Sequence, residues 1–286
     1  MTYDTWQSLP SMFFEIAEQG GDNAFMWRKE AGSYKPLSWR DTAQQVRYMA
    51  KGLAALGVAA GDRIVIVAEN RPEWAIADIA VMTLGAISVP AYTTNTVRDH
   101  RHVLSDCRAK GVIVSTRALA ARVLPAAAET APTEFIVSME ATEPGAFDIA
   151  MHGWDDVMAT GAASEHDLAP GLEALTRQDV ACLIYTSGTG GNPKGVMLSH
   201  RAIMINCYSA CELLRLLGLG DEVFLSFLPL SHAYEHTAGL YFPISIKAQI
   251  YYAESIETLA VNLVEARPTI MVSVPRLYEA MHRRIV

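Results

Sequence analysis

One stretch of the chain, residues 186–195, combines residue types that are suited to holding a phosphate group. It reads TSGTGGNPKG and lies between two apolar runs. Glycine lets backbone N–H groups converge on an anion without obstruction by a side chain. The hydroxyl groups add further donors, and Lys194 adds a point charge. The pattern therefore predicts a phosphate-binding loop, and the alternative is a β-hairpin with a long flexible connection.

This stretch differs from two common phosphate-binding motifs. A Walker A loop places its lysine before Ser or Thr and leads into a helix. Here Pro193 precedes the lysine, Gly195 follows it, and residues 195–199 (GVMLS) have the pattern of a strand. The G-x-G-x-x-G pattern of a dinucleotide-binding fold is also missing from this stretch. A P-loop kinase or ATPase is therefore the disfavoured alternative.

Residues 185–200, YTSGTGGNPKGVMLSH, resemble the phosphate loop of the adenylate-forming superfamily, which includes acyl-CoA synthetases, luciferases and peptide-synthetase adenylation domains. The resemblance implies that Lys194 is a catalytic residue that neutralises phosphate charge and that the Thr189 hydroxyl assists Mg²⁺. Gly190 departs from the family, which has Thr or Ser there, and the lost hydroxyl donor is worth about 1.5–3 kcal/mol. The implied nucleotide-binding residues are Thr186, Ser187, Gly188, Thr189, Gly190, Gly191 and Lys194.

A second segment, FLPLSHAYEHTAGLYFPI (227–244), resembles the family's histidine-containing motif beside the carboxylate substrate. His232 stands where the family has a histidine near the acyl carboxylate, which implies a catalytic and substrate-orienting role. His236 matches a position that borders the entrance to the acyl tunnel in fatty-acid members, which implies a substrate contact. The plainer alternatives are a histidine satisfied at a strand end, and an ion pair between His236 and Glu235.

Two further segments, residues 68–94 and 273–285, resemble long-chain acyl-CoA synthetases. The resemblance covers the chain from about Met12 onward. It implies that a fatty acid or another carboxylate is activated by ATP to an acyl-adenylate and then to acyl-CoA, with ATP, Mg²⁺ and CoA as cofactors and co-substrate.

The family's adenine-binding motif, hinge and C-terminal domain come after the point at which this chain stops. We therefore expect the N-terminal part of an acyl-CoA synthetase, inactive alone. A degenerate binding module of the same fold, without catalysis, is the second alternative, and Gly190 supports it.

The surrounding sequence alternates short apolar runs with segments of helical periodicity. Such alternation predicts β-α-β units, parallel sheets and right-handed crossovers. Ser38 and Ser199 are expected to cap helices, and the helix over residues 116–129 is expected to break near Pro125. The expected strands are 62–69, 86–90, 111–115, 134–139, 181–185, 195–199, 221–230, 249–253 and 269–274, with a last helix from Arg276.

Together these elements predict a doubly wound α/β fold with two stacked subdomains, incomplete at the C-terminus. We place the first subdomain at residues 1–175 and the second, which carries the phosphate loop, at 176–286. Residues 140–178 are rich in Ala, Gly, Pro and acidic residues and are expected to form a surface connection with one short helix around Trp154.

Composition narrows the class of protein further. Apolar residues make up 51% and charged residues 19% of the 286-residue chain, enough for a sizeable core. A net charge of −8 argues against nucleic acid as a partner. The four cysteines are expected to be reduced packing residues. No apolar run predicts a transmembrane segment, so a cytoplasmic location is expected; peripheral membrane contact and a homodimer are left open.

Overall fold

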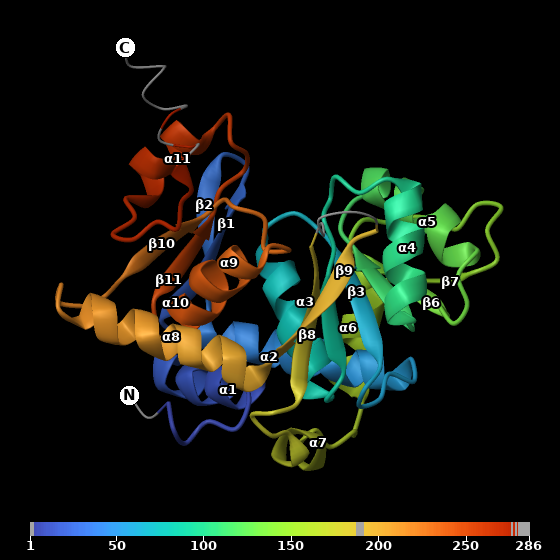
Figure 1. The fold of residues 1–286 in the computed structure, drawn as a ribbon, viewed down its shortest axis with the longest axis horizontal. Helices are drawn as coiled ribbons and strands as arrows, with labels where there is room; N and C mark the ends of the chain where they lie inside the picture. Colours follow the sequence, from blue (N-terminus) through green and yellow to red (C-terminus); the bar gives the residue numbers. More distant parts are fainter. Residues whose placement is uncertain (1–2, 187–191, 276, 278, 280–286) are drawn as a thin grey trace.

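Two β-sheets with helices around them form the structure, a computed structural model that describes residues 3–186, 192–275, 277 and 279. Figure 1 shows the smaller sheet on the left and the larger one on the right. The larger sheet has the order β7-β6-β5-β3-β4-β8-β9. Its strands are β3 (Arg63–Val67), β4 (Ile87–Pro90), β5 (Gly111–Val114), β6 (Phe135–Ser138), β7 (Ala150–Gly153), β8 (Val180–Thr186) and β9 (Lys194–Ser199).

The larger sheet is parallel except for β9, which pairs antiparallel with β8. Alternate residues of β3 enter two different apolar clusters, with Ile64 and Ile66 in one and Val65 and Val67 in the other. Both faces of the sheet are therefore covered by helices, which explains why its strands read as continuous apolar runs. The predicted doubly wound α/β class is confirmed.

The smaller sheet has the order β10-β11-β1-β2 and brings together segments far apart in the chain. Its N-terminal hairpin, which the sequence analysis did not predict, pairs through β1 with β11 in parallel. Strands β1 and β2 share this sheet with β10 and β11, whereas β8 lies beside β4 in the larger sheet. The subdomain boundary at residue 175 stays a prediction. The strands are β1 (Ala24–Glu30), β2 (Ser33–Ser38), β10 (Val223–Ser226) and β11 (Gln249–Tyr252).

One helix, α3 (Pro72–Thr83), lies between the two sheets, and every one of its residues is buried. The apolar cluster around it includes residues from both sheets, among them Phe25, Ile64 and Ile250. A helix that is apolar on all sides is typical of such a central position. Asp78, in the middle of this helix, is an acidic residue with no exposed surface and therefore requires a partner.

Several of the other helices, among them α1, α2, α4, α5 and α8, begin at a polar side chain that accepts a hydrogen bond from a free backbone N–H group. The predicted caps are confirmed, because the side chain of Ser38 accepts from Asp41 N and that of Ser199 accepts from Ala202 N. The other helices are α1 (Leu9–Gly20), α2 (Trp39–Ala55), α4 (Val97–Cys107), α5 (Arg117–Ala128), α6 (Trp154–Ala163), α7 (Ala169–Ala174), α8 (His200–Arg215), α9 (Ala233–Glu235), the π-helix η1 (His236–Tyr241), α10 (Phe242–Ser245) and α11 (Leu259–Ala266).

Three local predictions were wrong. Helix α5 continues through Pro125, although a proline removes one helical hydrogen bond. The segment 140–178 is not only a surface connection, because β7 extends the larger sheet beyond β6. The expected strand 269–274 is reduced to a single bridge between Phe224 and Ile270. The helix expected from Arg276 falls largely outside the described residues.

The four cysteines are buried and form no disulfide bonds, as expected for packing residues. Within the described part of the chain, no helix has the length and apolar character needed to cross a bilayer.

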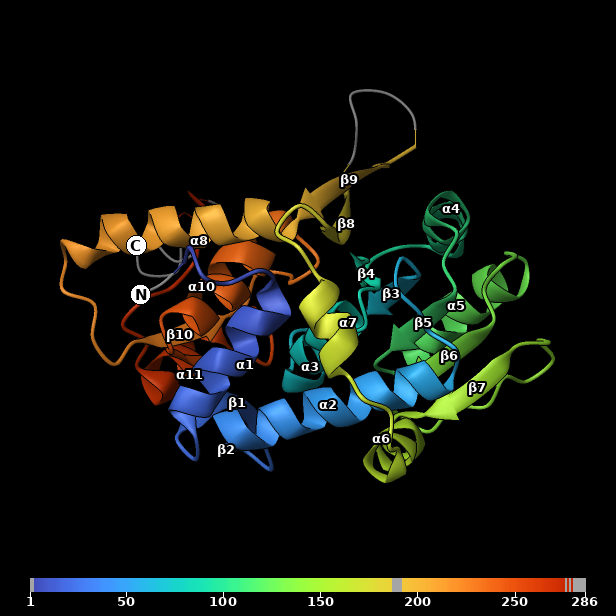
Figure 2. The same cartoon turned by 90° about the horizontal axis from the view of Figure 1, so that it is seen from below.

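Helices α2 and α6 approach each other closely because glycines face the contact. A Cβ added to Gly161 would lie 1.8 Å from the carbonyl oxygen of Tyr48, and one added to Gly52 would lie 2.2 Å from that of Val157. Figure 2 shows α2 running from the hairpin of the smaller sheet to α6. Backbone atoms cannot move aside as a flexible side chain can, so these two positions require glycine.

Replacement of Gly161 by alanine should therefore destabilise the protein by about 1–3 kcal/mol, since the helices must separate to admit a methyl group. The urea midpoint of unfolding measures this change. Gly171→Ala in α7 is the matched control, because its Cβ would come no closer than 3.9 Å to Thr83 O. Equal midpoints for the two variants would contradict the close contact.

Candidate functional site

The predicted phosphate loop connects two paired strands at the edge of the larger sheet. Strands β8 and β9 form an antiparallel ladder whose last pair joins Thr186 and Lys194. The structure therefore brings the first and last residues of the loop together and confirms that a strand, not a helix, follows it. The other predicted loop residues, Ser187, Gly188, Thr189, Gly190 and Gly191, lie outside the described residues, and their roles stay predictions.

Helix α4 contacts the loop end of this hairpin at two points. The Tyr185 hydroxyl donates to the Asp106 carboxylate at 2.6 Å, and His102 Nε2 lies 2.7 Å from the Pro193 carbonyl oxygen. Because the carbonyl only accepts, Nε2 carries the proton. Burial and the hydrogen bond to Asp106 raise the pKa of Tyr185, so its hydroxyl stays a donor. The i, i+4 spacing of His102 and Asp106 was the available sequence signal for this contact.

The packing around position 195 also explains why a glycine stands there. A Cβ at this position would lie 3.1 Å from the Tyr185 ring and 3.3 Å from its hydroxyl oxygen. The absence of a side chain lets the ring of Tyr185 lie against β9 and reach α4. The glycine that separates this loop from a Walker A motif therefore serves the anchoring of the hairpin.

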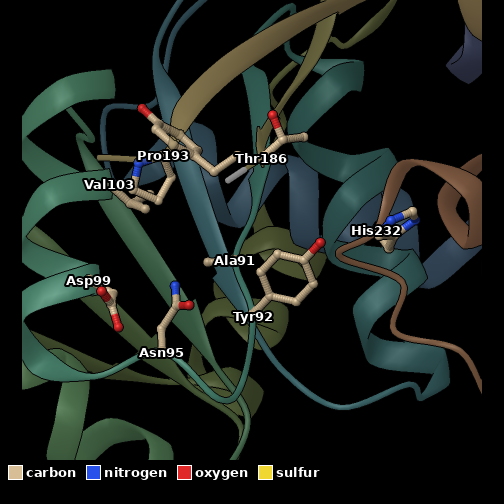
Figure 3. A pocket seen from close by; sticks show the side chains of 9 residues that line it. Ala91, Tyr92, Asn95, Asp99, Val103, Thr186, Pro193 and His232 are labelled. Carbon is tan, nitrogen blue, oxygen red and sulfur yellow. The ribbon is translucent and has the colours of Figure 1, made fainter. Parts of the chain in front are cut away.

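A cavity of about 380 Å³ opens beside the loop end of the hairpin. It lies at the carboxyl ends of the parallel strands β4 and β8, where ligands of open α/β sheets usually bind. Figure 3 shows His232 on one side of it and Asp99 with Asn95 on the other, with Tyr92 between them. The cavity is lined by Ala91, Tyr92, Asn95, Asp99, Val103, Tyr185, Thr186, Pro193 and His232.

His232 reaches the cavity from the other sheet, on the loop between β10 and α9. Its Nδ1 accepts from the backbone N–H of Tyr234 at 3.2 Å, which caps the short helix α9. The neutral ring therefore carries its proton on Nε2, and this N–H can donate to a ligand oxygen. Of the predicted site residues, Thr186 and His232 line one cavity, and Lys194 is exposed at the hairpin without an ion pair to any described residue.

His236 lies apart from this surface, fully buried in η1. Its Nε2 is 3.0 Å from Asp78 Oδ2, and the Tyr241 hydroxyl donates to the same oxygen at 2.6 Å. Burial lowers the pKa of His236, but the Asp78 carboxylate outweighs burial and raises that pKa to about 10. The ring is therefore charged at neutral pH and forms a buried ion pair.

The suggested ion pair between His236 and Glu235 was wrong. Glu235 instead accepts a hydrogen bond from Ser226 Oγ at 2.7 Å, and Asp78 is the partner of His236. Glu235 ends α9 and His236 begins η1, and consecutive residues of helical backbone point to different sides. The local sequence therefore gave no sign of these long-range partners. A substrate contact by His236 stays a prediction.

Comparisons with known proteins show what this chain is similar to in sequence and fold. A family described as AMP-binding enzyme matches residues 13–284. The long-chain-fatty-acid–CoA ligase FadD15 of Mycobacterium tuberculosis is 31% identical over 275 residues, which are 96% of this chain and 45% of the relative. The chain thus spans less than half the length of this relative.

Two solved structures show the same fold. The adenylation domain of a carboxylate reductase from Mycobacterium chelonae matches with a TM-score of 0.83 and 22% identity, over 98% of this chain and 48% of that one. The corresponding domain from Segniliparus rugosus, in complex with AMP and a co-purified carboxylic acid, matches with a TM-score of 0.84 and 20% identity, over 97% and 50% of the two chains. None of these comparisons supports the P-loop kinase alternative.

The buried pair of Asp78 and His236 generates a pH-dependent prediction. An unfolded histidine titrates near pH 6.5, whereas folded His236 titrates near 10. The stabilisation from its proton is therefore fully present below pH 6.5 and is lost as the pH rises from 6.5 to 10. His236→Gln should cost about 3–5 kcal/mol at pH 7, because it leaves the Asp78 carboxylate buried without a counter-charge.

The free energy of unfolding in urea, measured from pH 6 to 10, checks both statements. The double variant Asp78→Asn with His236→Gln is the control, since it buries no charge and should recover part of the lost stability with a flatter pH dependence. A single variant as stable as the wild type would show that the ion pair is absent.

Proposed function

Because the chain belongs to the family of AMP-binding enzymes, we propose that it forms the phosphate- and carboxylate-binding part of an AMP-forming acyl-CoA synthetase. The observation that carries the proposal is the position of the β8–β9 hairpin. Its loop end, with Thr186 and Lys194, lies beside the cavity that His232 lines. A long-chain fatty acid is the proposed substrate, since FadD15 is a long-chain-fatty-acid–CoA ligase.

The residues around the cavity fit two negatively charged substrates. His232 offers its Nε2–H, Thr186 offers a hydroxyl, and Lys194 offers an exposed cation that no described carboxylate neutralises. Donors that are fixed before the substrates arrive stabilise developing negative charge without reorganisation. The complex of the Segniliparus domain with AMP and a carboxylic acid is consistent with two such ligands on this fold.

The proposed reaction has two steps. A carboxylate oxygen attacks the α-phosphorus of ATP and the bond to pyrophosphate breaks, which gives an acyl-adenylate. The thiol of CoA then attacks the acyl carbon, loses its proton, and AMP leaves. In the first step His232 donates its Nε2–H to the carboxylate oxygen that does not attack, which orients the substrate.

The hairpin would hold the β- and γ-phosphates during the first step, with Lys194 offsetting their charge. Mg²⁺ would supply further neutralisation of the pyrophosphate, and Thr189 is the proposed hydroxyl near it. A cytoplasmic location stays a prediction, and a homodimer is left open.

Binding of magnesium pyrophosphate tests the phosphate site without requiring an adenine pocket. Titration calorimetry on this chain should give a measurable affinity, and Lys194→Ala should weaken it by roughly 10–100-fold, since a charge-assisted hydrogen bond contributes about 1.5–3 kcal/mol. Lys35→Ala is the matched control, because Lys35 is also exposed on a strand of an antiparallel hairpin. It should leave the affinity unchanged.

Two outcomes would overturn the assignment. One is an equal loss of affinity in the two lysine variants, which would indicate a diffuse charge effect. The other is the absence of pyrophosphate binding by the wild-type chain, which would favour a module without a phosphate site.

A further inference from the structure

The two walls of the cavity belong to different sheets. Tyr92 and Asn95 follow β4 of the larger sheet, whereas His232 follows β10 of the smaller one. The position of His232 relative to the hairpin therefore depends on what attaches the loop after β10 to the larger sheet. Asn70, which follows β3 and precedes α3, makes this attachment through its side chain.

The Asn70 amide holds the loop on both sides of Pro229. Its Nδ2 donates to the Leu228 carbonyl oxygen at 2.6 Å, and its Oδ1 accepts from Leu230 N at 3.0 Å. The turn continues with a hydrogen bond from His232 N to the Pro229 carbonyl oxygen at 2.9 Å. One side chain thus supplies the donor and the acceptor that this short turn lacks.

The same amide is also connected to the segment after His232. Asn70 Nδ2 lies 3.0 Å from Ser226 Oγ, which in turn donates to Glu235 Oε1 at 2.7 Å. Room for the Glu235 side chain exists because Gly239 has none; a Cβ there would lie 2.3 Å from the Glu235 carboxyl carbon. The segments before and after His232 are therefore both hydrogen-bonded to the Asn70 side chain, directly or through Ser226.

We propose that Asn70 is a positioning residue that fixes His232, and with it the carboxylate-binding wall, relative to the phosphate hairpin. This role rests on the proposed function, in which His232 orients the carboxylate. A role in stability alone would make the half-buried Asn70 equivalent to any other amide with similar hydrogen bonds.

Asn262 provides that comparison. It is fully buried on α11, accepts from Glu254 N at 3.2 Å, and its Nδ2 donates to the Glu254 carboxylate at 3.1 Å. None of these contacts involves a residue that lines the cavity. Asn262→Ala is therefore a control for the loss of amide hydrogen bonds at a distance from the site.

The test compares Asn70→Ala, Asn70→Asp and Asn262→Ala in this chain. Asn70→Asp retains an acceptor for Leu230 but loses the donor and sets a carboxylate against the Leu228 carbonyl oxygen. The first readout is the ¹⁵N NMR signature of the His232 ring, assigned with a His232→Gln variant. The wild type and Asn262→Ala should show mainly the Nε2–H tautomer, and both Asn70 variants should shift toward a mixture of tautomers.

The second readout is the affinity for palmitate and for magnesium pyrophosphate. Both Asn70 variants should weaken palmitate binding roughly tenfold, since hydrogen bonds that hold the turn are lost, and should change pyrophosphate affinity less than about twofold. If Asn70→Ala does not fold, Asn70→Asp carries the comparison. An unchanged His232 tautomer in the Asn70 variants, or the same shift in Asn262→Ala, would overturn the positioning role.

The two readouts also separate the two hypotheses. A wild-type chain that binds no palmitate would contradict the proposed function. The ring signature of His232 would still decide whether Asn70 positions it.

Discussion

The ion pair between Asp78 and His236 is the interaction on which the arrangement of the two sheets depends. Helix α3 is buried on every side between them, and water cannot solvate a charge at its centre. The partner therefore has to come from the neighbouring layer, and η1 supplies both the imidazolium and the Tyr241 hydroxyl. This requirement places η1 against α3 and so places the segment that begins with His232 at the mouth of the cavity.

As a result of this packing, the two sheets carry different parts of the site. The larger sheet carries the hairpin, which α4 anchors through His102 and Asp106. The smaller sheet carries the loop with the histidine. A reaction between two anionic substrates needs donors for both at a fixed separation, and two rigid layers joined by buried polar contacts supply such a separation.

Much of the larger sheet could be predicted from the sequence because its information is local. Apolar runs such as residues 63–67 and caps such as Ser38 and Ser199 act over a few residues. The hairpin β1–β2 was missed because its burial depends on β11, far along the chain. For the same reason the residue types of Asp78 and His236 gave no sign that they would meet.

The segment between β6 and α7 has the composition of a linker, but its parts differ in how well they tolerate a change in length. Residues 141–149 are mostly exposed, whereas β7 completes the edge of the larger sheet and α6 follows it without an intervening loop residue. An extra residue in the exposed part lengthens a surface loop at small entropic cost. The same insertion in α6 before Gly161 would rotate this glycine away from α2 and turn a bulkier side chain toward it. The exposed loop can therefore change in length, whereas the register of α6 is fixed by its contact with α2.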